Sequence, residues 1–206
     1  MVDMLDTEIL AFDGFDELDV VAPLEILRSA GFEVRLVTLE PCDVVSGAYG
    51  LKVRPDDVLG DRPALLVVSG GGWVAKAPQG ARLEVRRGVL PAAIAERHAS
   101  GSVVAGVCSG VMLLAAAGLL RGRPAVTHHL VLDELRTYGV DVRPDARVVD
   151  DGDVMTSGGV TSGIDLALHI IGRELGKDAA VAAAARIEYD VRGAVLNTSQ
   201  RRSSPR

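Results

Sequence analysis

Short apolar runs alternate with longer segments of helical spacing along this chain. Four of the runs are rich in Val, Leu, Ile and Phe, and most of them end near glycines or prolines, as buried strands do. They predict strands at 8–15, 32–40, 64–72 and 102–108. Between them, apolar residues recur every three or four positions, which indicates helices. Helices are expected at 109–120, 129–139, 160–176 and 177–189, and over part of 80–99.

Two stretches of the chain need a separate interpretation. Residues 16–31 have helical spacing, but Pro23 lies inside the pattern. We therefore expect the helix to begin near Pro23 and the preceding residues to form a loop. Residues 146–159 form two extended runs around Asp151 and Gly152, a pair that favours a hairpin turn.

Strands that alternate with helices predict an α/β fold. Because the runs are apolar, the sheet should be mostly parallel and covered by helices on both faces, as in a flavodoxin-like doubly wound sandwich. We expect one domain over residues 1–190 and a C-terminal tail over 191–206 that need not be ordered. Ligands of such sheets bind beyond the carboxyl ends of the strands, so residues 12–19, 69–72 and 107–109 should surround one crevice.

Composition narrows the classes of function. Hydrophobic residues make up 48% of the 206 residues and aromatic residues 3%, so the core must be aliphatic. The net charge of −6 and the lack of a basic patch argue against nucleic acid as a partner. No apolar stretch suits a membrane span, and no secretory signal is visible near the start. With Cys42 and Cys108 interpreted as free thiols, we expect a cytoplasmic protein.

Cys108 lies where a predicted strand meets a predicted helix, in the sequence GVCSG at 106–110. A thiol in the first turn of a helix faces unpaired N–H groups and the positive end of the helix dipole, and both favour the reactive thiolate. Glycines on either side allow the sharp turn of a nucleophile elbow. Cys108 is therefore a candidate nucleophile. A buried cysteine that serves only as a small apolar side chain is the alternative.

Two further segments fall at strand ends around the same crevice. The backbone N–H groups of the glycines in SGGGW, residues 69–73, are open to a ligand. With that of Ser109 they could form an oxyanion hole, and a plain tight turn is the alternative. In FDGFDELD, residues 12–19, Asp19 lies on the apolar approach to a helix. Its carboxyl group would either have a raised pKa and share a proton with a thiol, or cap the helix.

Histidines and metal ligands carry less information. His128 and His129 follow Thr127, which we interpret as the cap of a helix that begins there. One of the two histidines could also orient the thiol or line the pocket. The chain has no His-x3-His or Cys-x2-Cys spacing, so no metal site is expected.

Longer motifs resemble a known family. The segment VVAGVCSGVMLLAAAGLLRGRPAVTHH at 103–129, followed by ARVVDDGDVMTSGGVTSGIDLALHII at 146–171, resembles the ThiJ/PfpI superfamily. Within it the chain is most similar to the isocyanide (isonitrile) hydratase branch and to the domains fused to AraC-type regulators. The resemblance extends over about residues 8–189. It implies a homodimer that acts on a small-molecule substrate without a cofactor.

Carried over by position, the resemblance makes Cys108 the nucleophile and Asp19, four residues before a proline, its acidic partner. Gly71 and Ser109 match the backbone donors around the nucleophile, and His128 matches the histidine of a Thr-His motif. The residues expected to line the pocket are Gly70, Gly72, His128 and His129.

The chain departs from the hydratases that it resembles at several positions of this set. Those enzymes have tryptophan where this chain has His129, proline where it has Ser69, and usually threonine where it has Ser109. The departures fall on positions expected to shape the pocket and therefore bear on the choice of substrate.

Three functions are compatible with these residues. The leading one is hydration of an isocyanide to an N-substituted formamide, in which the Cys108 thiolate attacks the isocyanide carbon and Asp19 supplies a proton. The second is a glyoxalase-, deglycase- or amidase-type reaction of the same thiol. Glyoxalase-like members often have glutamate at the position of Asp19, so the aspartate favours the first. The third is a non-enzymatic redox or ligand sensor, because an exposed thiolate oxidises readily.

Overall fold

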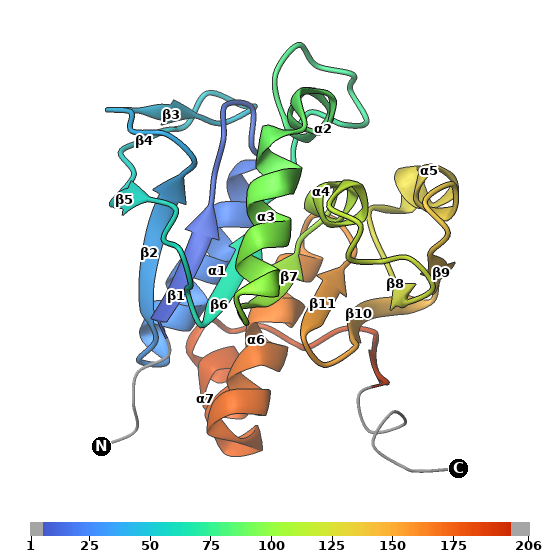
Figure 1. Cartoon of the computed structure of the whole chain (residues 1–206). Coiled ribbons are helices and arrows are strands. Elements are labelled where there is room, and N and C mark those ends of the chain that lie inside the picture. Colours follow the sequence, from blue (N-terminus) through green and yellow to red (C-terminus); the bar gives the residue numbers. More distant parts are fainter. Residues whose placement is uncertain (1–5, 199–206) are drawn as a thin grey trace.

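The central element of the protein is an eight-stranded sheet (Figure 1). The structure is a computed structural model that describes residues 6–198. Within that range the strand order is β12-β10-β11-β7-β6-β1-β2-β5. Neighbouring strands are parallel except β10 and β11, which form an antiparallel hairpin. The strands are β1 (Asp6–Leu10), β2 (Glu33–Thr38), β5 (Asp57–Val58), β6 (Leu65–Val68), β7 (Val103–Gly106), β10 (Ala146–Asp150), β11 (Val154–Ser157) and β12 (Ala194–Asn197).

Helices cover both faces of this sheet (Figure 1). α1 and α6 pack against each other on one face, with α7 against α6, and α2, α3 and α4 pack together on the other. This confirms the expected flavodoxin-like α/β sandwich. The helices are α1 (Glu17–Ser29), α2 (Ala81–Arg87), α3 (Val89–Ala99), α4 (Gly110–Ala116), α5 (Leu132–Arg136), α6 (Ser162–Leu175) and α7 (Lys177–Arg186).

Smaller elements decorate the sheet. Two short pairs of strands and one 3₁₀ turn lie outside it, and the hairpin of β3 and β4 follows β2. These elements are β3 (Val45–Ser46), β4 (Lys52–Val53), β8 (Pro124–Ala125), β9 (Asp141–Val142) and η1 (His129–Val131).

The core is aliphatic, as the composition predicts. The central strands β1, β6 and β7 contribute side chains such as Ile9, Leu66 and Val104, none of them exposed to solvent. Helix α4 is buried along nearly its whole length, because it lies directly behind the sheet and carries no charged side chain. The core thus holds α4, and the residues just before it, in a fixed position relative to the ends of β6 and β7.

The start of α1 differs from the expectation. We expected the helix to begin near Pro23, but α1 begins at Glu17 and Pro23 lies inside it. The side chain of Asp16, the residue before the helix, accepts a hydrogen bond from the backbone N–H of Leu18 and so caps the helix. Because proline lacks an N–H group, one backbone hydrogen bond of the helix is missing, but the cap and the buried inner face outweigh that loss. Asp19 is consequently in the first turn of α1.

The end of the chain also differs from the expectation. Residues 194–197, assigned above to a tail, form β12, which pairs in parallel with β10 and closes one edge of the sheet. The edge N–H and C=O groups of β10 provide pairing that a sequence pattern does not reveal. The rest of the expected tail, residues 199–206, lies outside the described residues. Among the helices of residues 6–198, none has the length and apolar character needed to cross a membrane.

The cap of α1 can be tested by two substitutions at one position. Asp16→Ala removes the acceptor of the Leu18 N–H and should lower the free energy of unfolding by about 1 kcal/mol. Asp16→Asn keeps an oxygen acceptor and should lose much less. Urea denaturation followed by circular dichroism measures both values. Equal losses in the two variants would contradict the capping role.

Candidate active site

Cys108 occupies a sharp turn between β7 and α4, here called the elbow (residues 106–110). Its φ angle is +54°, in the left-handed region that residues other than glycine seldom adopt. Two hydrogen bonds hold this conformation. The Cys108 N–H donates to the Gly158 carbonyl at 3.3 Å, and the hydroxyl of Thr127 donates to the Cys108 carbonyl at 2.7 Å. Strained backbone of this kind persists where the surrounding structure fixes it, often at functional sites.

The glycines of the elbow allow close packing onto the sheet. A Cβ atom at Gly110 would collide with the carbonyl oxygen of Val68 and would lie 2.5 Å from that of Ser69, both at the end of β6. A Cβ at Gly106 would lie 3.1 Å from the Cα of Val111. The position of the elbow therefore requires glycine at 110, and glycine at 106 avoids a tight contact with α4.

Asp19 is fully buried in the first turn of α1. Its Oδ2 accepts a hydrogen bond from the Gly70 N–H at 3.0 Å, while Oδ1 has no hydrogen-bond partner of regular geometry among residues 6–198. Burial raises the pKa of this carboxyl well above its usual value, and the charge of Asp16 raises it further. The Gly70 N–H and the Cys108 thiol act in the opposite direction. Asp19 therefore lies beside the Cys108 thiol, and Asp16, not Asp19, caps α1.

The thiol of Cys108 is buried beside this carboxyl. Burial raises the pKa of the thiol, and so does the negative charge of Asp19. The backbone N–H and the hydroxyl of Ser109 lower it, but by less. The expectation that the start of α4 would favour a resting thiolate is therefore wrong, because desolvation outweighs the donors at the helix start. Burial and the neighbouring carboxylate therefore both favour the protonated thiol over the thiolate.

The glycines after β6 serve the pair in a different way from the one expected. The Gly71 N–H, expected to face a ligand, donates to the hydroxyl oxygen of Ser109 at 2.9 Å. Gly71 thus positions Ser109, whose own N–H and hydroxyl face the thiol. The Gly70 N–H holds Asp19, and the Gly70 carbonyl accepts a hydrogen bond from the Asp16 N–H at 2.8 Å.

Gly72 belongs to the turn that follows. Its φ angle is +68°, and its carbonyl accepts a hydrogen bond from the N–H of Ala77 at 3.0 Å. A Cβ atom at Gly72 would collide with the carbonyl oxygen of Gln79. Gly72 therefore helps to close the loop of residues 72–80.

The two histidines stack on each other but have different surroundings. His128 caps η1, since its Nδ1 accepts the Leu130 N–H at 3.2 Å. This leaves the proton of the neutral ring on Nε2. Burial, and then the charge of His129, lower the pKa of His128. His129 stacks on His128 and lines a small cavity of about 290 Å³ behind the elbow. Thr127, expected to be the cap, instead binds the Cys108 carbonyl.

Gly159 belongs to the site but was not among the expected residues. A Cβ atom at this position would lie 2.8 Å from the Sγ of Cys108 and would collide with the ring of His128. The absence of a side chain at Gly159 therefore brings the thiol and the imidazole ring to the same small space. The sequence signals are the pair of glycines at 158–159, which is typical of many turns, and their place in the segment 146–171 that resembles the family.

Among residues 6–198, no three His, Cys, Asp or Glu side chains are arranged to hold a metal ion. Both cysteines are free thiols, Cys42 exposed and Cys108 buried. The chemistry that the site can perform is that of one thiol, one carboxyl group and the donors of Ser109.

Comparison with known proteins identifies the family of the chain. Residues 8–173 match the model of the DJ-1/PfpI family. An isonitrile hydratase of Pseudomonas putida is 35% identical over 181 residues, which cover 87% of this chain and 76% of that protein. A deglycase of Thermococcus kodakarensis is 30% identical over 153 residues, covering 72% and 87%.

Solved structures show the same fold. A ThiJ/PfpI family protein from Pseudomonas syringae superposes with a TM-score of 0.78 at 27% identity, covering 90% of this chain and 75% of that one. The DJ-1beta protein of Drosophila melanogaster gives a TM-score of 0.80 at 20% identity, covering 91% and 99%. At that lower identity the likeness concerns the fold alone.

The effect of Asp19 on the thiol can be measured directly. Asp19→Asn keeps the size of the side chain and removes its negative charge, so the pKa of Cys108 should fall. In a Cys42→Ser background, the rate of Cys108 alkylation by iodoacetamide should then reach its plateau at lower pH than in the parent. Asp13→Asn is the matched control, because Asp13 is exposed on the loop that precedes α1 and its carboxylate accepts a hydrogen bond from the Ser46 N–H. A plateau unmoved in Asp19→Asn, or moved to higher pH, would contradict the coupling.

The space at Gly159 yields a second test at the same thiol. Gly159→Ala should slow alkylation of Cys108 about 10- to 100-fold, as a displacement of about 1 Å can do. Gly158→Ala is the neighbouring control, because the atom nearest to its Cβ would be the hydroxyl oxygen of Ser162, at 3.1 Å. Thermal melts verify that both variants fold. If the two variants react equally fast, Gly159 does not define the space around the thiol.

Proposed function

Because the chain belongs to the DJ-1/PfpI family, we propose that it is a cysteine-dependent enzyme that hydrates an isocyanide to an N-substituted formamide. The observation that carries the proposal is the Asp19 carboxyl buried beside the Cys108 thiol. Hydration of an isocyanide needs a nucleophile at the terminal carbon and a proton delivered to that same carbon. A thiol and an acid with raised pKa values, placed together, can supply both.

The reaction begins with a proton transfer within the pair. The Cys108 proton passes to the Asp19 carboxylate, and a sulfur electron pair forms a bond to the isocyanide carbon. Asp19 then gives that proton to the same carbon, which produces a thioimidate, R–N=CH–S. The N–H and hydroxyl of Ser109 stabilise the charge on sulfur while it lasts, since both already lower the thiol pKa.

Water completes the cycle. It adds to the thioimidate carbon, and one of its protons goes to the nitrogen. Collapse of the adduct forms the carbonyl group and breaks the C–S bond, and the second proton of water returns to sulfur through Asp19. One isocyanide and one water thus give one formamide, and the thiol and carboxyl return to their starting states.

The raised thiol pKa supports this order of events. A resting thiolate would react with many electrophiles, whereas a protonated pair becomes nucleophilic only when a substrate carbon is ready to take the proton. The aspartate at position 19 favours the hydratase over a glyoxalase-like or deglycase reaction. Relatives named deglycases, at about 30% identity, make α-oxoaldehyde chemistry the natural second candidate.

The homodimer implied by the resemblance remains part of the proposal. Leu18 and Val21 on the outer side of α1 are each more than one third exposed, and Tyr49 near the β3–β4 hairpin is 85% exposed. The Glu17 carboxylate joins this hairpin to α1, because it accepts a hydrogen bond from the Tyr49 N–H at 2.7 Å. A second copy seated on this surface would cover apolar side chains next to the helix that carries Asp19.

A turnover assay with matched variants tests the function. The purified protein should convert an aromatic or aliphatic isocyanide to the formamide, detected by absorbance and mass. Cys108→Ala should abolish the reaction, and Asp19→Asn should slow it about 10²- to 10⁴-fold, the usual contribution of a placed acid. Circular dichroism checks that both variants fold.

Two other results would redirect the assignment. Formamide produced equally well by Cys108→Ala would exclude the covalent mechanism. Turnover of methylglyoxal, with none of either isocyanide, would assign the same thiol to α-oxoaldehyde chemistry.

A further inference from the structure

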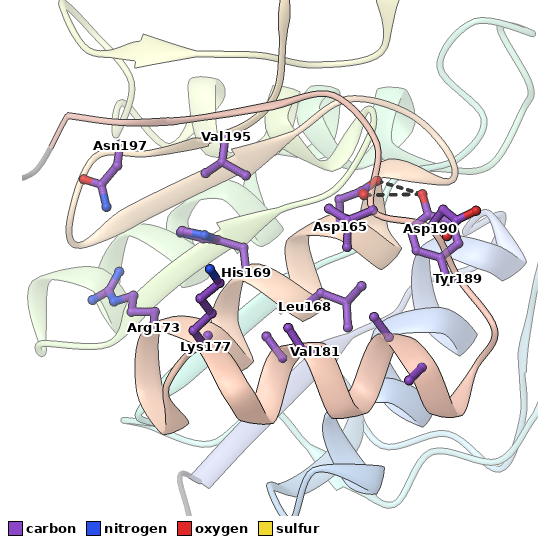
Figure 2. A pocket seen from close by; sticks show the side chains of 15 residues that line it. Asp165, Leu168, His169, Arg173, Lys177, Val181, Tyr189, Asp190, Val195 and Asn197 are labelled. Carbon is purple, nitrogen blue, oxygen red and sulfur yellow. Dashed lines mark hydrogen bonds between the residues drawn. The ribbon is translucent and has the colours of Figure 1, made fainter.

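A second cavity lies far along α6 from the elbow. It is a groove of about 690 Å³ between α6, α7 and β12, here called the α6–α7 groove (Figure 2). Cys108 and Asp19 are not among its lining residues. A volume of this size is typical of sites for small molecules. The groove exists because the chain returns after α7 and adds β12 at the sheet edge, so that β12 forms its opposite wall.

Apolar side chains form the middle of the groove. Along α7, Ala180, Val181 and Ala184 lie on one helix face, and Leu168 of α6 and Val195 of β12 face them (Figure 2). Val181 is 58% exposed and Val195 41% exposed. Exposed apolar side chains that gather in one hollow usually mark a binding site, whereas scattered ones do not.

The two ends of the groove differ in charge. His169, Arg173 and Lys177 gather at one end, whereas Asp190 lies at the other (Figure 2). His169 and Arg173 are already paired with Asp150, a residue outside the lining. Arg173 also contacts Glu174, a second acid outside the lining, at 3.1 Å.

Lys177 differs from its two basic neighbours. No ion pair of Lys177 is formed within residues 6–198. Its ammonium group points toward His169 at the basic end in Figure 2. The basic end therefore has a cation without a counterion, and the apolar floor begins directly beside it.

We propose that the α6–α7 groove binds an amphipathic carboxylate, a medium-chain fatty acid in chemical class. The carboxylate contacts Lys177, and the apolar chain lies along α7 toward Tyr189, because the opposite orientation would place two negative charges together at Asp190. The floor from Lys177 to residue 185 is about 12 Å long, from the rise of about 1.5 Å per helical residue. A chain of about ten carbons matches that length.

The charge of the chain itself argues against its own end as the occupant. Residues 199–206, which follow β12, have the sequence SQRRSSPR. This segment has three arginines and no large apolar side chain, so it would bring positive charge to Lys177 and leave the apolar floor uncovered. A second copy of the chain is the other competitor, and the experiment below separates it from a small ligand.

Calorimetric titration with sodium decanoate at concentrations below micelle formation tests the proposal. Saturable one-to-one binding is expected, with affinity lost about three- to fourfold for each methylene removed from the chain. Lys177→Met keeps the alkyl stem and removes the charge, and it should weaken binding at least about fivefold, as the loss of a charged hydrogen-bond partner does. Lys52→Met, at an exposed position of β4, is the matched control and should bind as the parent does.

A second pair of variants tests the apolar floor. Val181→Asp should abolish binding, while Val89→Asp should not, although both valines are equally exposed, at 58% and 59%. The proposal is overturned if decanoate does not bind, if Lys177→Met and Val181→Asp bind as the parent does, or if decylammonium binds equally well. It is also overturned if light scattering shows that Val181→Asp dissociates a dimer, since a second copy would then occupy the groove. Binding is read without any turnover, so this outcome is independent of the isocyanide assay.

Discussion

The rest of the site depends on the burial of a carboxyl group against a thiol. An isolated ionised carboxylate is expensive to bury, so the structure must either supply hydrogen-bond donors or keep the proton on the group. Asp19 receives one donor, the Gly70 N–H, and its second oxygen has none of regular geometry within residues 6–198. An unsatisfied polar atom of this kind costs about 1–3 kcal/mol. Because this oxygen lacks a hydrogen-bond donor, the Asp19 carboxylate is suited to accept a proton from Cys108 and to transfer it to the substrate.

Several segments that are far apart in sequence are hydrogen-bonded to one another around this pair. The Asp16 N–H donates a hydrogen bond to the Gly70 carbonyl, and the Gly70 N–H donates one to the Asp19 carboxylate. Two hydrogen bonds therefore join the start of α1 to the residues that follow β6. Gly71 then fixes the hydroxyl of Ser109. Each of these hydrogen bonds involves a backbone group of a glycine. Gly70 can approach Ser109 this closely only without a side chain, since a Cβ atom there would lie 2.7 Å from the Ser109 nitrogen. The strained backbone of Cys108, which costs on the order of 1–3 kcal/mol, is tolerated within this network.

The sequence predicts the parts of the site that depend on local pattern. The elbow follows from glycines on either side of Cys108, and the meeting of three strand ends follows from the α/β alternation. The direction of the thiol pKa shift cannot be predicted from the sequence. It depends on how deeply Asp19 is buried in the folded protein, and a sequence pattern does not reveal the depth of burial. The start of α1 was missed because Pro23 is a stronger local signal than a single capping aspartate at position 16. Gly159 was missed because its contribution is an absent side chain, visible only once Cys108 and His128 are placed around it.

The strand β12, which the sequence analysis missed, also forms one wall of the α6–α7 groove. Its sequence, AVLN, is short, and its side chains are mostly exposed, so it resembles a tail. It pairs because β10 would otherwise present free N–H and C=O groups at the sheet edge. Covering that edge places Val195 opposite α7 across the groove, and one end of the groove is at Lys177, which forms no ion pair within residues 6–198. Helix α6 contacts both places, because Gly163 packs against Val107 of the elbow and Arg173 lines the groove. The start of α6 thus packs against the elbow, while its last turns line the groove that β12 encloses.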